Sequence, residues 1–229
     1  MPQHPVTILE RPAYGVVEAA GLLGLRPDRV RAWLDGYGRS GTHYPPVIRE
    51  ETTGVDVVTW GEFVELGYLR EYRREVSMQK LRPVISDLRR DFATPYPLAT
   101  ARLFVFDHEV VLEAQQKHDL PNSVAIVVRT GQGILLAPSA GRFFKKVEFD
   151  HQGRGVAERL RPAGPTSPVV IDPLVGFGQP NVSGVATERL WELYDAGESV
   201  DEIATGYDIS LSDVNAAIAY EEQFRSLAA

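Results

Sequence analysis

The sequence predicts an α+β protein with a winged helix-turn-helix at its front, a small antiparallel β-rich section in its middle and three short helices at its end. Three observations predict this class. Apolar residues recur at helical spacing in both end sections. Short runs of β-branched and aromatic residues fill the middle. Glycine- and proline-rich stretches separate the sections, which we place at residues 1–98, 99–166 and 167–229.

The first section opens with a helix over residues 14–24, a short turn and a second helix. Proline suits the first turn of a helix, so Pro27 is expected to open the second one. The apolar stripe of this helix consists of Val30, Trp33 and Leu34, which leaves Arg29 and Arg31 facing outward. This pattern is typical of a helix-turn-helix whose second helix presents basic residues.

Two short strands around a turn at Gly54 are expected over residues 47–58, and together they would form a β-wing. Two amphipathic helices are expected next, over residues 60–75 and 78–92. Prolines after Thr94 end the second of these helices. The middle section then contains β-rich runs at 103–106, 124–129 and 133–136, followed by a hairpin of residues 144–149 with 156–160.

The last section repeats the helix-turn-helix pattern over residues 198–220, but with the opposite charge. Its second helix carries Asp213, Glu221 and Glu222 and has no basic residue before Arg225. The helices are expected to form a three-helix domain around an apolar core. The predicted core residues are Leu190, Leu193, Ile203, Ala204, Val214 and Ile218.

Charge is distributed unevenly along the chain. The formal net charge is −7, yet residues 1–99 carry 13 basic and 13 acidic residues and are neutral. Residues 168–229 carry two arginines against eleven acidic residues, a net of −9. Because DNA is a dense row of phosphates, the first helix-turn-helix can dock on it and the second is repelled. We therefore predict that the front of the chain binds DNA and the back binds another partner.

Composition excludes several other classes. The sequence has no apolar run of about 18 residues and no basic-then-apolar leader, so neither a membrane span nor a secretory signal is expected. Cysteine is absent and the histidines are scattered, so no metal site or cofactor is predicted. No catalytic motif is present, and we expect a cytoplasmic protein that is not an enzyme.

The N-terminal pattern resembles the MerR-type winged-helix domain. The resemblance rests on Val16-Val-Glu-Ala-Ala-Gly-Leu-Leu-Gly-Leu-Arg-Pro-Asp-Arg-Val-Arg-Ala-Trp33 and continues through Leu69-Arg-Glu-Tyr-Arg-Arg74 and Ser77-Met-Gln-Lys-Leu-Arg82. It covers residues 14–92 and implies that the second helix enters the major groove while the wing touches the DNA backbone. The residues that it implies as base or phosphate contacts are Arg26, Arg29 and Arg31, with Arg49 as a phosphate contact on the wing.

The alternative to DNA contact is that these arginines form only a solvent-exposed face of the helix. One departure from the family also matters, because MerR-type proteins usually continue into a long coiled coil, and here a β-rich section follows instead. This departure argues against an effector-sensing activator.

The C-terminal section resembles a small bacterial helical-domain family whose members are often described as VapB-type antitoxins. The resemblance rests on an ordered series of motifs over residues 168–224: Asp172-Pro173, Gly178-Gln-Pro180, Ala196-Gly-Glu-Ser199 and Ile203-Ala-x-x-Tyr207. It implies the antitoxin of a type II toxin–antitoxin pair, whose partner is a PIN-domain ribonuclease toxin of the VapC type. It further implies a homodimer that represses its own operon at an inverted-repeat operator.

The toxin-binding surface is left open by the sequence. Aromatic residues are enriched at protein interfaces, which makes five of the C-terminal section candidates: Trp191, Tyr194, Tyr207, Tyr220 and Phe224. Arginines of the middle hairpin are a second possibility because they suit an acidic toxin site, namely Arg142, Arg154, Arg159 and Arg161. The acidic helices are a third, opposite a basic toxin surface.

Two other functions compete with the antitoxin hypothesis. The first is a stand-alone MerR-like transcription regulator that senses a small ligand in its middle section. The second is an interaction scaffold that never meets DNA.

Overall fold

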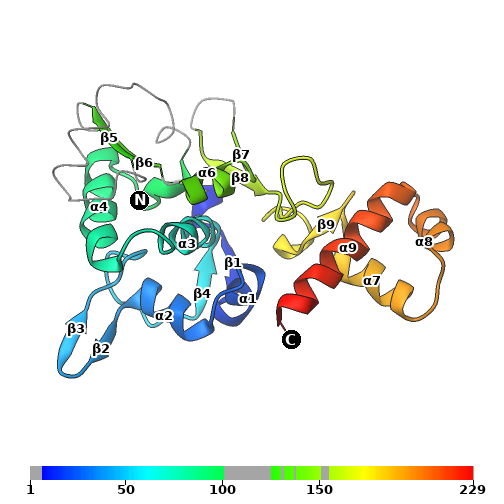
Figure 1. Cartoon of the computed structure of the whole chain (residues 1–229), viewed down its shortest axis with the longest axis horizontal. Coiled ribbons are helices and arrows are strands. Elements are labelled where there is room, and N and C mark those ends of the chain that lie inside the picture. The colour runs from blue at the N-terminus through cyan, green and yellow to red at the C-terminus, as the bar shows by residue number, and fades with distance from the viewer. Residues whose placement is uncertain (1–6, 101–124, 130–131, 137, 151–154, 229) are drawn as a thin grey trace, which may run out of the picture. The chain divides into compact units, whose positions relative to one another are not determined.

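The computed structural model describes residues 7–100, 125–129, 132–136, 138–150 and 155–228. The chain divides into two compact units (Figure 1). The N-terminal unit comprises Met1–Phe144 and Phe149–Ala157, and the C-terminal unit comprises Lys145–Glu148 and Glu158–Ala229. Helices alternate with small two-stranded sheets in the described residues, which confirms the α+β class.

The N-terminal unit contains the expected pair of short helices, α1 (Val16–Leu22) and α2 (Pro27–Asp35). Pro27 stands in the first turn of α2, as predicted, and the helix buries the predicted stripe of Val30, Trp33 and Leu34. Gly36 follows with φ +78°, and a Cβ there would lie 2.5 Å from the Tyr44 carbonyl oxygen. Only glycine therefore lets the chain turn so tightly at the end of α2.

The wing predicted over residues 47–58 is wrong. The hairpin lies earlier, between β2 (Tyr37–Arg39) and β3 (Thr42–Tyr44), which pair in antiparallel fashion. In the predicted wing only β4 (Val57–Thr59) is a strand, and it pairs with β1 (Pro12–Gly15).

Tertiary contacts explain this difference. Val47 and Ile48 are buried, and both of their backbone N–H groups donate to the carbonyl oxygen of Trp33 at 2.9 and 3.0 Å. These donors are thus satisfied by the end of α2 and not by a strand partner.

The two predicted amphipathic helices are confirmed as α3 (Trp60–Tyr72) and α4 (Met78–Phe92). Helix α3 is the centre of the unit, since it contacts the short helices η1 (Ile8–Glu10), η2 (Pro97–Ala99) and α6 (Pro138–Phe144). Gly67 permits the contact with α6, because a Cβ at this position would lie 2.1 Å from the ring of Phe143.

The expected β-rich runs of the middle section are partly within the described residues. Strands β5 (Ala125–Arg129) and β6 (Gln132–Leu136) pair with each other, as do β7 (Val147–Phe149) and β8 (Ala157–Leu160), in agreement with the predicted hairpin. The predicted strand at 103–106 lies outside the described residues. The boundaries of the two units differ from those of the three predicted sections. Helix α6, from the middle section, packs on α3 of the N-terminal unit, whereas residues 158–166 belong to the C-terminal unit.

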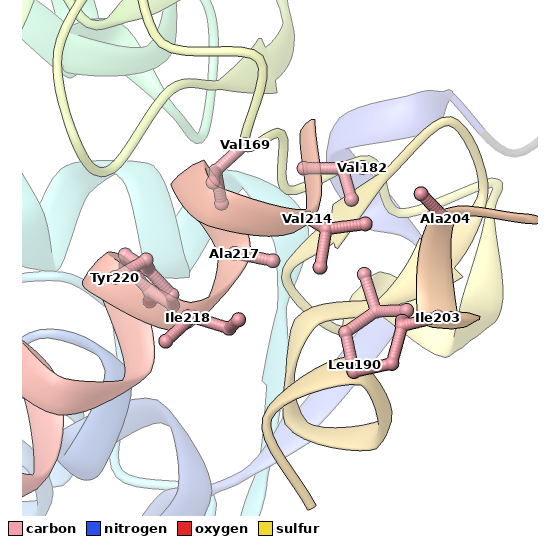
Figure 2. Packing of buried hydrophobic residues seen from close by; sticks show 9 residues of the cluster. All are labelled: Val169, Val182, Leu190, Ile203, Ala204, Val214, Ala217, Ile218 and Tyr220. Carbon is pink, nitrogen blue, oxygen red and sulfur yellow. The ribbon is translucent and has the colours of Figure 1, made fainter. Parts of the chain in front are cut away.

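The C-terminal unit contains β9 (Asn181–Val182), β10 (Val185–Ala186) and the three helices α7 (Thr187–Asp195), α8 (Val200–Tyr207) and α9 (Leu211–Ala228). A capping box of Ser199 and Glu202 begins α8, and Asp208 ends it in the left-handed conformation. Figure 2 shows the core, whose members are Val169, Val182, Leu190, Ile203, Ala204, Val214, Ala217, Ile218 and Tyr220. Five of the six predicted core residues belong to it, and Leu193 packs at its edge.

A partly buried ion-pair network, formed by Arg49 with Asp35 and Glu62, joins α2 to α3. The Arg49 guanidinium lies 3.0 Å from Asp35 and 2.7 Å from Glu62. It also donates to the carbonyl oxygens of Val55 and Val57. Burial opposes ionisation of Asp35, but hydrogen bonds from Thr53 and Arg49 outweigh it and lower the pKa of this carboxyl.

We predict that Arg49→Ala destabilises the N-terminal unit. Removing one partner leaves two carboxylates without their cation in a largely buried place, which costs about 3–5 kcal/mol. Hydrogen exchange of the full chain, followed by mass spectrometry on peptides of α2 and α3, measures the loss of protection. Arg26→Ala is the control, because the Arg26 side chain is 81% exposed. Equal protection in the two variants would contradict a structural role for Arg49.

Glu65 is an acidic residue in the core of the N-terminal unit. Its side chain is fully buried on α3, and one carboxyl oxygen accepts the backbone N–H of Leu98 at 2.9 Å. The other oxygen has no hydrogen-bond partner among the described residues. Burial raises the pKa of Glu65 to about 8, so the carboxyl is largely neutral at pH 7.

The raised pKa makes stability depend on pH. The folded protein holds this proton up to about pH 8, whereas the unfolded chain releases it near the ordinary value of 4.5. The folded state therefore binds more protons between these values, and stability falls as pH rises through this window, by roughly 3–5 kcal/mol. We predict a flatter dependence of Tm on pH between 5 and 8 in Glu65→Gln. Parallel curves for wild type and variant would exclude this origin.

Candidate functional site

The outer face of α2 carries the arginines that the sequence singled out. Arg29 is exposed and, within the described residues, forms no ion pair. Arg26 is also exposed, but its guanidinium lies 3.6 Å from Asp28. Arg31 is less exposed and donates to both carboxylate oxygens of Asp56, at 3.2 and 3.3 Å. Arg29 is thus the cation of this face that is free to meet an anion.

The hairpin of β2 and β3 adds to this face directly after α2. It turns through Ser40 and Gly41, both with positive φ, as in the two-residue turns that favour hairpins. Arg39 is exposed on it, and Tyr37 stacks on Tyr44 at 4.7 Å across the strands. The sequence analysis missed this hairpin, although the Ser-Gly step between two tyrosines is its signal.

Arg49 does not belong to the same surface. It lies outside the hairpin, and its side chain is only 9% exposed because the ion-pair network with Asp35 and Glu62 surrounds it. Its donors are directed at these carboxylates and at backbone oxygens. Arg49 therefore does not lie on an exposed wing where it could contact a DNA phosphate, as the sequence analysis predicted.

The aromatic residues named as partner contacts differ in exposure. Tyr220 is in the core (Figure 2), and Phe224 stacks on it at 6.2 Å. Trp191 is covered by Arg225, whose guanidinium lies 3.7 Å from the ring centroid. The Tyr207 hydroxyl accepts a hydrogen bond from Arg189. Tyr194, at 43%, is the most exposed of the five described aromatic residues.

A different aromatic residue is far more exposed. Phe177 lies in the loop after Asp172 and is 94% exposed, with φ at +57°. Leu174 and Val175 of the same loop are exposed as well, at 61% and 37%. We call residues 174–177 the apolar loop. A bulky residue in the left-handed region is strained, and such strain is concentrated at functional sites.

The base of the apolar loop is held by charge. Asp172 accepts the backbone N–H of Leu174 at 2.8 Å and a hydrogen bond from Arg159, also at 2.8 Å. Arg159 is half-exposed and Asp172 is buried, so this pair fixes the point from which the loop projects. Arg159, predicted as a partner contact, thus lies beside a stronger candidate. Arg154, predicted with it, lies outside the described residues.

One further carboxylate is buried in the C-terminal unit. The Thr187 hydroxyl donates to Glu221 at 2.5 Å. Burial raises the pKa of Glu221. In the described part of the chain no group of three or more histidine or acidic residues is arranged to hold a metal ion, and no helix there is both long and apolar enough to cross a membrane.

Comparison with known proteins places the chain in a family. Residues 169–220 match the family described as "Protein of unknown function (DUF433)". Over 96% of its length the chain is 33% identical to the uncharacterized protein Rv2308 of Mycobacterium tuberculosis, of which it covers 94%. The chain therefore belongs to the family of Rv2308.

Two more similarities extend over nearly the whole chain. It is 25% identical to a candidate antitoxin of the same organism, VapB45, over 90% of this chain and 92% of that one, and in this sense it is antitoxin-like. The crystal structure of Rv2018 from M. tuberculosis has the same fold, with a TM-score of 0.70, 23% identity, and coverage of 93% of this chain and 100% of the other.

We predict that Phe177→Gly leaves the C-terminal unit folded and equally or more stable. Glycine adopts the left-handed conformation without the strain that a side chain meets there, so up to about 1 kcal/mol is gained. Thermal unfolding of the full chain, monitored by circular dichroism, measures this. A clearly lowered Tm would mean that the Phe177 side chain stabilises the fold, and its exposure would then be no sign of a binding site.

Proposed function

We propose that this protein is the antitoxin of a type II toxin–antitoxin pair. Its C-terminal unit binds and blocks a PIN-domain ribonuclease of the VapC type, and the protein itself is not an enzyme. The observation that carries the proposal is the similarity to a candidate antitoxin along almost the whole chain. The apolar loop supports it, because a strained and exposed phenylalanine is suited to fill a pocket on a partner protein.

Charge around the apolar loop also suits a protein partner more than DNA. Residues 168–229 carry a net charge of −9. An apolar anchor surrounded by negative charge favours a partner whose binding surface has a basic rim, and it repels the phosphates of DNA. We therefore propose that the toxin contact consists of the apolar loop and the acidic helices of the same unit, with Tyr194 as a further contact.

We further propose that the N-terminal unit is a MerR-like winged helix that represses its own operon. Helix α2 enters the major groove with Arg29 towards the bases, and Arg26 and Arg31 flank it. The hairpin of β2 and β3 takes the place of the wing, with Arg39 towards the backbone. A homodimer on an inverted-repeat operator completes the arrangement, because a two-fold protein matches a two-fold site.

The antitoxin half is tested by capture from the native host at high salt, which removes association mediated by DNA. We expect a stoichiometric small ribonuclease whose activity is inhibited by the purified chain. Phe177→Gly should weaken this capture at least tenfold, whereas Val17→Ser, at an exposed apolar residue of the N-terminal unit, should leave it unchanged. Recovery of the chain without a ribonuclease would favour the stand-alone regulator instead.

The DNA half predicts a loss of operator binding in Arg29→Ala. A lost base or phosphate contact costs about 1–3 kcal/mol, which fluorescence anisotropy on the DNA upstream of the gene resolves. Arg142→Ala is the control, at an exposed arginine of α6 in the same unit. Toxin capture should be unaffected by Arg29→Ala. If operator binding and toxin capture were both lost in the folded variant, the proposal that the two units bind different partners would be wrong.

A further inference from the structure

A second basic site in the N-terminal unit is formed by residues other than those on the outer face of α2. One face of α4 carries Arg82, Ser86 and Arg89, spaced at one and two helical turns. Together with the segment of residues 45–50 this face lines a cavity of about 490 Å³. Its lining residues are Pro45, Pro46, Val47, Arg49, Glu50, Arg82, Ser86, Arg89 and Arg90. We call it the α4 cavity.

Two of its four guanidinium groups are not neutralised by a carboxylate. Arg49 is paired with Asp35 and Glu62, and Arg90 lies 3.0 Å from Asp87. Arg89 donates to backbone oxygens, at 2.5 Å to Ile48. Among the described residues, neither Arg82 nor Arg89 forms an ion pair. Arg82 and Arg89 are therefore the cations of the lining that are left to pair with an anion, beside the exposed carboxylate of Glu50.

Arg82 carries the strongest evidence for a ligand. Its Nε atom is buried and has no hydrogen-bond partner within the part of the chain that the structure describes. A buried donor without a partner costs about 1–3 kcal/mol, which an anion in the cavity would recover after a small rotation of the side chain. The fork of Nε and Nη atoms matches the paired oxygens of a phosphate.

The cavity is also of the right size and setting. Pockets for small ligands usually have volumes of about 300–1,000 Å³. The nearby carboxyl of Glu65 is largely neutral at pH 7 and does not cancel the charge of Arg89. The cavity lies between α4 and residues 45–50, whereas Arg29 and Arg39 are exposed on other elements of the unit, α2 and β2.

We infer that the α4 cavity binds the phosphate group of a free small molecule, such as a nucleotide, through Arg82 and Arg89. This site is separate from the proposed toxin and operator contacts and does not depend on them.

The test uses the full chain with inorganic pyrophosphate as the probe, titrated by calorimetry in phosphate-free buffer. We expect saturable binding at one site per chain, weakened at least tenfold in Arg82→Gln and unchanged in Arg142→Gln. Arg82→Gln should fold normally, because the lost Nε donates to no group of the described residues. Ser86→Glu is a second variant, since an exposed carboxylate one turn from both arginines should weaken binding similarly. Absence of saturable binding, or wild-type affinity in both variants, would overturn the inference.

A second arm separates a free ligand from a DNA phosphate. Arg82→Gln should keep operator affinity within about twofold, and Arg29→Ala should keep pyrophosphate affinity. A tenfold loss of DNA affinity in Arg82→Gln would show that the cavity holds a backbone phosphate, and the free-ligand inference would be wrong. If no DNA binds at all, only the proposed operator contact fails, because the pyrophosphate titration is independent of it.

Discussion

The N-terminal unit depends on the guanidinium of Arg49. Residues 50–56 form no helix or strand, so their backbone groups need partners from elsewhere. Arg49 donates hydrogen bonds to the carbonyl oxygens of Val55 and Val57. It also pairs with the carboxylates of Asp35, at the end of α2, and Glu62, at the start of α3. One side chain thereby fixes the loop, the end of α2 and the start of the central helix α3. The position of the arginine-bearing face of α2 is a consequence of this arrangement.

Local periodicity explains which elements could be predicted from the sequence. Helix α4 has the predicted bounds of 78–92, because its apolar and basic residues separate cleanly onto opposite faces. The core around Leu190 and Ile218 was predicted for the same reason. The wing was misplaced because Val47 and Ile48 have the composition of a strand but are bound by Trp33, and a contact between distant residues leaves no local pattern.

The candidate sites show the same limit. The arginines of α2 could be predicted, since an outward position on an amphipathic helix follows from spacing alone. The exposure of Phe177 could not be predicted, because a glycine-rich loop has no periodic face. Tyr220 is a candidate interface residue by sequence, but in the structure it packs into the core. The α4 cavity was missed as well. It requires α4 and residues 45–50 to face each other, which only the tertiary structure brings about.

The chain passes between the two units more than once, since Lys145–Glu148 belongs to the C-terminal unit and Phe149–Ala157 returns to the N-terminal one. The returning segment matters, because the indole N–H of Trp60 donates to the carbonyl oxygen of Ala157 at 2.8 Å. During synthesis the helices of the first hundred residues leave the ribosome well before their last partner exists. The N-terminal unit thus completes its core only after residue 157 has been made, and no single cleavage of the chain releases either unit intact.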